Sequence, residues 1–254
     1  MILAVDVGNT ETHIGLFGEN ALVRDWRFVT KPIRTVDECA HAMADLLEQA
    51  DAARTDLEGI VIGSVVPAAT GSFAEVALRW VGKNPLIVGP DLVMPVKICT
   101  KVPEQVGADR IANAVAGCQW REPPLVVVDL GTATTFDVIA RGARYLGGVI
   151  FPGVTTSLAE LVRRTAKLTG IEICRPDRVI GTDTEECMQS GIVLGSADMI
   201  DGLLRRIWRE LGEECPAIVT GGLGSSIAPL CSNVDEIDPH LTLKGLKILF
   251  DLNR

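Results

Sequence analysis

Apolar residues gather in short continuous runs along the chain, a pattern that predicts buried β-strands separated by turns. The first runs predict three strands in hairpin order, Ile2–Asp6, His13–Phe17 and Leu22–Val29, with a turn at Gly18–Asn20. Runs that are apolar at successive positions are typical of strands covered on both faces. Helical spacing begins after Thr35, which starts a capping box. The chain therefore opens with antiparallel strands followed by a helix.

The rest of the pattern alternates helices with strands. In the first half it predicts strands at Gly59–Val66 and Leu86–Val88, helices at Phe73–Val81 and Ala108–Cys118, and an ordered loop at Gly89–Val106. In the second half it predicts strands at Leu125–Asp129, Thr135–Ile139, Tyr145–Phe151 and Ala217–Thr220, and helices at Thr155–Lys167, Thr184–Leu211 (whole, or broken near Gly191 and Gly195) and Leu241–Asn253. Such alternation favours α/β domains.

One strand–turn–strand unit occurs twice. L-A-V-D-V-G-N-T-E-T-H-I at 3–14 and V-V-V-D-L-G-T-A-T-T-F-D at 126–137 place Asp, Gly and Thr at a common offset of 123 (129 − 6). A duplicated unit about half the chain apart indicates two like domains. We expect these domains at residues 1–118 and 119–254, with a hinge at Glu122-Pro123-Pro124.

Composition narrows the class of protein. The chain has 254 residues, of which 47% are hydrophobic, enough to fill cores and to exclude disorder. A net charge of −9 argues against a nucleic-acid partner. The apolar runs are too short to span a membrane, and the N-terminal residues do not form a signal peptide. We expect a cytoplasmic protein with no membrane partner.

Seven cysteines are scattered along the chain without C-x-x-C spacing, and the sequence has three histidines. No zinc-ligand pattern results. The cysteines are therefore interpreted mostly as small core side chains in a reducing compartment. They lie at positions 39, 99, 118, 174, 187, 215 and 231.

The two Asp–Gly–Thr turns are candidates for binding phosphate. Small residues allow the backbone to approach a ligand, and free N–H groups with hydroxyls can surround phosphate oxygens. An aspartate at the end of a strand can bind a cation that screens the phosphate charge. The alternative is a pair of ordinary hairpin turns, which the repetition in register disfavours.

Three further motifs have both a structural and a functional interpretation. Thr220–Gly224 is a glycine-rich connection after a strand, or a loop that packs on an adenosine ring. Asp109 caps a helix, or accepts a proton while Arg110 holds a substrate carboxylate. Gly147-Gly148 with Pro152–Thr156 marks a β-bulge followed by the start of a helix, or shapes the substrate side of a cleft.

Missing motifs exclude several common enzyme classes. The chain has no G-x-x-x-x-G-K-[ST], the signature of P-loop enzymes. It has no G-x-G-x-x-G after its first strand, which disfavours a Rossmann site, and no G-x-S-x-G nucleophile elbow.

Taken together, the motifs resemble those of type III pantothenate kinases, within the actin, hexokinase and Hsp70 superfamily. They span nearly the whole chain in the expected order. They are D-V-G-N-T at 6–10, S-V-V-P at 64–67, G-A-D-R at 107–110, D-L-G-T-A-T-T-F-D at 129–137, G-G-x-I-x-P-G at 147–153, Gly181 with Thr184, M-Q-S-G at 188–191 and T-G-G at 220–222.

The resemblance implies two actin-like (ribonuclease H-like) α/β domains with a nucleotide cleft between them. It implies phosphorylation of pantothenate by ATP with Mg²⁺, the first step toward coenzyme A, in a homodimer. Asp109 matches the proton acceptor and Asp129 the site of a monovalent cation, potassium or ammonium. The implied phosphate contacts are Asp6, Val7, Gly8, Asn9, Thr10, Glu11, Thr12, His13 and Thr132. The implied substrate contacts are Thr100, Gly107, Ala108, Asp109, Arg110 and Thr184.

Two positions depart from the pattern of that family. Thr100 stands where members commonly have a substrate-contacting tyrosine, so only a shorter hydroxyl is available there. Thr169 follows T-A-K-L in place of a frequent proline. Two rival functions remain at this point: a non-catalytic regulatory protein of the same fold, and another small-molecule kinase of the superfamily.

Overall fold

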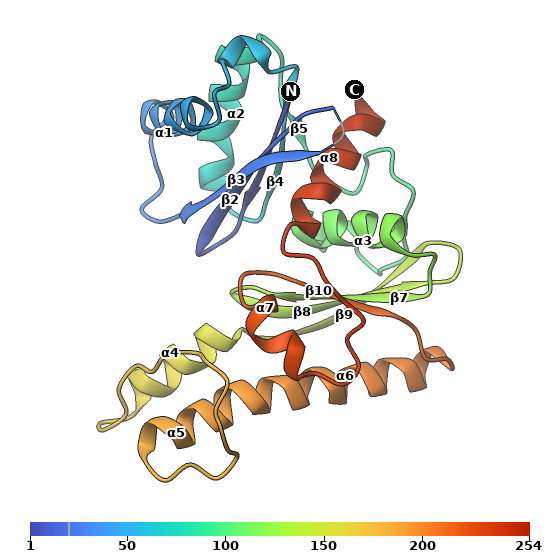
Figure 1. Ribbon diagram of the computed structural model, residues 1–254. Helices are drawn as coiled ribbons and strands as arrows, with labels where there is room; N and C mark the ends of the chain where they lie inside the picture. The colour runs from blue at the N-terminus through green and yellow to red at the C-terminus, as the bar shows by residue number, and fades with distance from the viewer. Residues whose placement is uncertain (20) are drawn as a thin grey trace. The chain divides into compact units, whose positions relative to one another are not determined.

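The computed structural model describes residues 1–19 and 21–254 and divides the chain into two compact units (Figure 1). The first unit comprises Met1–Gln119 together with Leu241–Arg254, and the second comprises Trp120–His240. The first unit thus differs from the contiguous domain expected at residues 1–118, because it also includes the terminal segment Leu241–Arg254. Asn20, in the expected turn at Gly18–Asn20, is outside the described residues.

The first unit is built on a five-stranded sheet of order β3-β2-β1-β4-β5. Strands β1, β2 and β3 pair antiparallel, whereas β4 and β5 run parallel to β1. The strands are β1 (Ile2–Val7), β2 (Glu11–Phe17), β3 (Leu22–Val29), β4 (Gly59–Ser64) and β5 (Leu86–Ile87). The parallel pairing places the carboxyl ends of β1 and β4 at one edge of the sheet.

Helices cover both faces of this sheet (Figure 1). The helices are α1 (Val36–Gln49), α2 (Pro67–Val81), α3 (Ala108–Trp120) and α8 (Leu241–Asn253). On one face, Val5 and Leu16 pack with Met43 of α1 and Phe73 of α2 in a buried apolar core. The capping box at Thr35 is confirmed. Helix α2 begins before the predicted Phe73, because Pro67 supplies a favourable first helical residue.

The opposite face is lined with glycine where α8 crosses it. A Cβ at Gly15 would lie 2.8 Å from Leu243, and one at Gly63 would lie 2.8 Å from Leu246. A Cβ at Gly59 would collide with the Phe250 ring. A side chain at any of these three glycines would force the facing α8 side chain to move, so glycine favours this close approach.

Two short elements interrupt the expected loop at Gly89–Val106. They are β6 (Lys97–Ile98) and a 3₁₀ turn at Pro103–Gln105. The pair Lys97–Ile98 has only one apolar residue, so no apolar run in the sequence marks this strand.

The second unit repeats the plan, with five of its own strands in the order β11-β10-β7-β8-β9. These are β7 (Leu125–Leu130), β8 (Ala133–Ala140), β9 (Arg144–Pro152), β10 (Ala217–Thr220) and β11 (Glu236–Ile237). Its helices are α4 (Val154–Arg164), α5 (Thr184–Gln189), α6 (Gly195–Leu211) and α7 (Gly224–Ile227). Helix α6 packs on one face through Ile200 and Leu204, which join Val128 in a buried core (Figure 1).

The joint between α5 and α6 is a π-helical turn at Ser190–Leu194. The expected break near Gly191 and Gly195 is therefore a change in helical pitch within one continuous run. Helix α4 ends at Arg164, before the predicted Lys167.

All seven cysteines are free. Burial raises the pKa of the Cys118 and Cys215 thiols to about 11 and that of Cys231 to about 12. Burial also raises the pKa of the Cys39 thiol. Thiols with raised pKa values are poor nucleophiles, in keeping with a packing role. Among the described residues, no helix is long and apolar enough to cross a membrane.

The crossing of α8 with α3 gives a test of the packing. A Cβ at Gly245 would collide with the Ala112 carbonyl oxygen, whereas a Cβ at Gly202 in α6 would meet no atom within 4 Å. We predict that Gly245→Ala destabilises the protein by about 1–3 kcal/mol through overpacking. The control Gly202→Ala should leave it as stable or slightly more stable, because alanine favours helix. Thermal unfolding of both variants measures the effect, and equal melting temperatures would contradict it.

Candidate active site

The turn between β1 and β2 presents its backbone to solvent. Asn9, Thr10 and Glu11 are exposed, while Val7 and Thr12 are buried. The Gly8 N–H donates to the Glu11 carbonyl oxygen at 3.0 Å, and a Cβ at Gly8 would lie only 2.9 Å from that oxygen. The tight turn thus requires glycine, as its motif suggested. The predicted phosphate loop of eight residues therefore has a solvent-exposed tip and flanks that are buried in the first unit.

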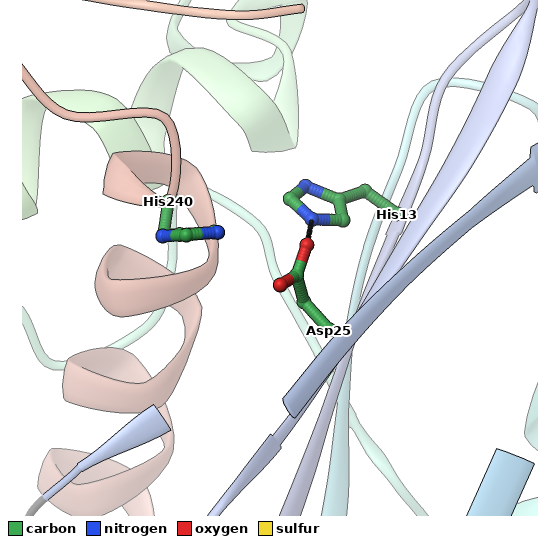
Figure 2. A group of neighbouring side chains, drawn as sticks. All are labelled: His13, Asp25 and His240. Carbon is green, nitrogen blue, oxygen red and sulfur yellow. Dashed lines mark hydrogen bonds and ion pairs between the residues drawn. The ribbon is translucent and has the colours of Figure 1, made fainter. Parts of the chain in front are cut away.

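His13 lies on β2 and is only 5% exposed. Its Nε2 atom is 2.7 Å from Oδ2 of Asp25 on β3, and the imidazole points at that carboxylate (Figure 2). His13 is also the cross-strand partner of Asp6. Paired residues in a sheet project from the same face. His13 therefore lies beside Asp6 and is held by Asp25, a residue that no motif singled out.

The G-A-D-R motif opens α3 at the same edge of the first sheet. A Cβ at Gly107 would collide with Oδ1 of Asp109 and lie 3.4 Å from Val65, just beyond β4. The Ala108 side chain lies 3.7 Å from the position of a Cβ at Gly63. Gly63 is the parallel partner of Asp6. The structure therefore brings the Asp109 motif and the Asp6 turn together within one unit.

The environment of Asp109 is compatible both with a helix cap and with a proton acceptor. Its Oδ1 atom accepts the N–H of Arg110 at 2.9 Å, which satisfies one donor of the first helical turn. No described residue donates a hydrogen bond to Oδ2. Asp109 is partly exposed. One carboxylate oxygen is thus fixed by the helix, and the other is available to a substrate hydroxyl.

The corresponding turn of the second unit joins β7 to β8. Gly131 donates its N–H to Ala133 at 3.1 Å. Thr132 is exposed at the tip, and its carbonyl oxygen accepts the Gly153 N–H at 3.1 Å and the Thr156 hydroxyl at 2.7 Å. The tip of this turn is therefore anchored by the first residues of α4 and the residue before them.

Asp129 lies at the end of β7, beside Thr220 of β10. Thr220 is its parallel partner on β10, and the Thr220 hydroxyl is buried with no hydrogen-bond partner among the described residues. Gly221 has φ +92°, and a Cβ there would lie 2.6 Å from Oδ1 of Asp129. A carboxylate and an unsatisfied hydroxyl side by side are the hard oxygen donors that alkali and alkaline-earth cations prefer. These residues fit a bound cation.

Two further predicted substrate contacts lie outside these turns. Thr184 is exposed at the first position of α5 and lines a cavity of about 560 Å³ in the second unit. The Thr100 hydroxyl is buried and has no partner among the described residues. A buried polar atom without a partner is costly, so it is a position where a ligand atom would be stabilising. The cavity is lined by Leu161, Leu168, Gly181, Thr182, Asp183, Thr184, Cys187, Met188, Gly191 and Ile192.

The two glycine motifs of the second unit both have structural roles. Gly147 has φ +106° and follows a register irregularity between Val138 and Ile139, which is the β-bulge interpretation. Gly221 accepts the N–H of Gly224 at the start of α7. The sequence signalled both glycines and the neighbouring Thr220, but it did not signal Asp25, which contacts its partner His13 across two strands.

Sequence comparison finds close relatives along the whole chain. Residues 2–206 match the family described as type III pantothenate kinase. The type III pantothenate kinase of Citrifermentans bemidjiense is 40% identical over 254 residues, covering 100% of both chains. That of Thermomicrobium roseum is 42% identical over 253 residues, covering 99% of this chain and 97% of the relative.

Solved structures with low sequence identity share the fold. Component A of (R)-2-hydroxyglutaryl-CoA dehydratase from Acidaminococcus fermentans has a TM-score of 0.57 at 14% identity, covering 98% of this chain and 96% of that one. A putative N-acetylglucosamine kinase from Porphyromonas gingivalis has a TM-score of 0.53 at 12% identity, covering 97% and 98%. These similarities show an actin-like α/β fold in two units. With the motifs at the turns and the full-length relatives, they establish that the chain belongs to the type III pantothenate kinase family.

Proposed function

We propose that this member of the family transfers the γ-phosphoryl group of ATP to the terminal hydroxyl of pantothenate, forming 4′-phosphopantothenate and ADP. Membership of the family supports a kinase that acts on pantothenate in coenzyme A biosynthesis. One structural observation carries the mechanism: Asp109 and the Asp6 turn lie at one edge of the first sheet. A proton acceptor and a phosphate-binding turn are the two parts that such a transfer needs.

In this proposal the turn of Asp6, Val7, Gly8, Asn9, Thr10, Glu11, Thr12 and His13 binds the phosphates, with its exposed tip in contact and its buried flanks in support. Exposed backbone N–H groups at a tight turn form an anion-binding concavity. Thr132 provides a second phosphate contact from the tip of the other turn. Mg²⁺, when bound with ATP, neutralises charge on the phosphate oxygens.

Asp109 accepts the proton of the attacking hydroxyl through Oδ2. The substrate oxygen then bonds to the γ-phosphorus, the bond from that phosphorus to the bridging oxygen breaks, and ADP leaves with the bond's electron pair. Oδ1 stays bound to the Arg110 N–H, which holds the carboxylate in place during the transfer. Because little covalent chemistry is asked of the protein, positioning and charge account for most of the rate.

The substrate contacts are proposed for the G-A-D-R motif together with two threonines. Gly107 and Ala108 bring the backbone close, and the Arg110 guanidinium is suited to a bidentate grip on the pantothenate carboxylate. Thr100 offers its buried, unsatisfied hydroxyl. Thr184 offers an exposed hydroxyl beside a cavity with several apolar residues.

A monovalent cation, potassium or ammonium, is proposed at Asp129. Its support is the neighbouring Thr220 hydroxyl, which needs a partner, and the close backbone at Gly221. The cation would add positive charge near the phosphates.

We further propose that the protein works in the cytoplasm without nucleic-acid or membrane partners, supported by its free cysteines and acidic charge.

Replacing the proton acceptor tests the mechanism. We predict that Asp109→Asn lowers kcat by about 10²–10⁴-fold, the usual contribution of a general base. Affinity for a non-hydrolysable ATP analogue should stay within about threefold, because the side chain faces the acceptor. Product formation and calorimetric binding measure the two effects. Asp45→Asn on exposed α1 is the matched control. Full activity in Asp109→Asn would contradict the proposed role.

The cation assignment predicts a salt-specific response. Potassium should activate the enzyme relative to equal concentrations of a tetraalkylammonium salt, and Asp129→Ala should abolish that activation. Initial rates across a potassium titration measure it. Thermal shift gives a second readout, since a cation that binds the folded state raises the melting temperature. A parent enzyme indifferent to potassium by both measures would refute the site.

A homodimer is the proposed assembly. The second unit exposes several large apolar side chains, including Ile150, Phe151, Val179 and Ile180, and exposed apolar side chains often mark interfaces. Sedimentation should therefore give about twice the chain mass of 27.2 kDa at micromolar concentration. Ile180→Asp should shift the equilibrium toward monomer, with Asp45→Asn as a control. A monomer across the whole concentration range would exclude the dimer.

A further inference from the structure

Thr30 lies just after β3, outside every motif noted in the sequence, and is 5% exposed. It makes three contacts with the β1–β2 turn. Its N–H donates to the Thr10 carbonyl oxygen at 2.9 Å, and its hydroxyl donates to the Gly8 carbonyl oxygen at 2.8 Å. Its hydroxyl oxygen also lies 2.9 Å from that of Thr12, which is fully buried. One side chain thus binds both sides of the turn.

The direction of these hydrogen bonds follows from counting protons. A threonine hydroxyl carries one hydrogen and can accept through its lone pairs. Thr30 uses its hydrogen on the Gly8 carbonyl, so the Thr12 hydroxyl donates to Thr30. The result is a buried chain from Thr12 through Thr30 to Gly8. Because these groups are shielded from water, leaving any of them unpaired is costly.

The second unit holds its turn in a similar way. Gly153 stands at the repeat position of Thr30 (30 + 123 = 153) and donates its N–H to the Thr132 carbonyl oxygen at 3.1 Å. The hydroxyl there comes from Thr156, which donates to the same oxygen at 2.7 Å. In both units the segment after the third strand supplies one N–H and one threonine hydroxyl to the carbonyl oxygens of the turn.

We propose that Thr30 and Thr156 are positioning residues that fix the two turns in the shape that binds the phosphates of ATP. The inference rests on the proposed function, because it assigns phosphate contacts to these turns. A carbonyl oxygen held from behind orients the peptide to which it belongs, and therefore the N–H groups of the turn. The turn then does not have to be ordered when the nucleotide binds, a cost that pre-organisation removes.

Removal of the Thr30 hydroxyl without loss of shape is the direct test. Thr30→Val should raise the dissociation constant of a non-hydrolysable ATP analogue and the KM for ATP by about three- to tenfold, the effect of one or two lost hydrogen bonds. The KM for pantothenate should change by less than about twofold. Thr30→Ser keeps the hydroxyl and should bind the analogue like the parent enzyme.

The matched control is Thr242→Val. Thr242 is also buried, and its hydroxyl donates to Oδ1 of Asn113 at 2.8 Å, so its hydrogen bond joins α8 to α3 and involves no residue of either turn. This variant should lower the melting temperature as Thr30→Val does, yet leave the affinity for the ATP analogue unchanged. If Thr30→Val loses stability but binds the analogue as the parent does, Thr30 is only structural and the proposal for it is overturned.

Thr156→Val extends the test to a site where folding is not at risk, because Thr156 is exposed. It should weaken analogue binding by about two- to tenfold, with recovery in Thr156→Ser. Thr165→Val is the control on the same segment, since its hydroxyl donates only to carbonyl oxygens at the end of α4. Unchanged binding in Thr156→Val would overturn the proposal for the second turn. A parent protein that does not bind the analogue would instead refute the proposed function.

Discussion

Helix α8 packs so closely on the first sheet and on α3 that side chains are excluded at several points of contact. Gly15, Gly59 and Gly63 admit Leu243, Phe250 and Leu246 of α8, and Gly245 lies against the Ala112 carbonyl of α3. A buried hydrogen bond from Thr242 to Asn113 adds to the second contact. Since α3 begins with the Asp109 motif, this packing holds Asp109 beside the sheet edge that bears Asp6. The last segment of the chain therefore helps to position the proposed acceptor motif of the first unit.

Duplication explains why the two units have similar sheets, but the two Asp–Gly–Thr turns have different neighbouring residues. Both turns rest on an apolar strand that ends in aspartate, and both are held by the segment after the third strand. In the first unit, α3 places Asp109, the proposed proton acceptor, at the edge of the sheet. In the second unit, Asp129 adjoins Thr220 and Gly221, an oxygen-rich environment suited to a cation. In the proposed mechanism, this common scaffold provides a phosphate contact in each unit and the proton acceptor in the first unit alone.

Local signals in the sequence predicted much of the fold. Strands β3 and β10 and helix α8 have the predicted bounds, because their apolar patterns end at clear turn residues. The capping box at Thr35 is local and was predicted too. The two-residue strand β11 was missed, since Glu236 and Ile237 do not form an apolar run. The place of α8 in the first unit was also missed, because packing between remote segments leaves no local signature.

The candidate site shows the same division. Residues in recurrent motifs, such as Asp109 and Gly8, were singled out from the sequence, and the structure places Gly8 in a tight turn and Asp109 at the start of α3. Asp25 and Thr30 were not identified, because each acts through a partner on another strand.

The most direct measurement of the function is the rate of ADP formation by the parent enzyme with and without pantothenate, beside a panel of sugars and small hydroxy acids. ADP formation that requires pantothenate is the predicted result. ADP formation with none of these acceptors, or with a different acceptor only, would contradict pantothenate phosphorylation.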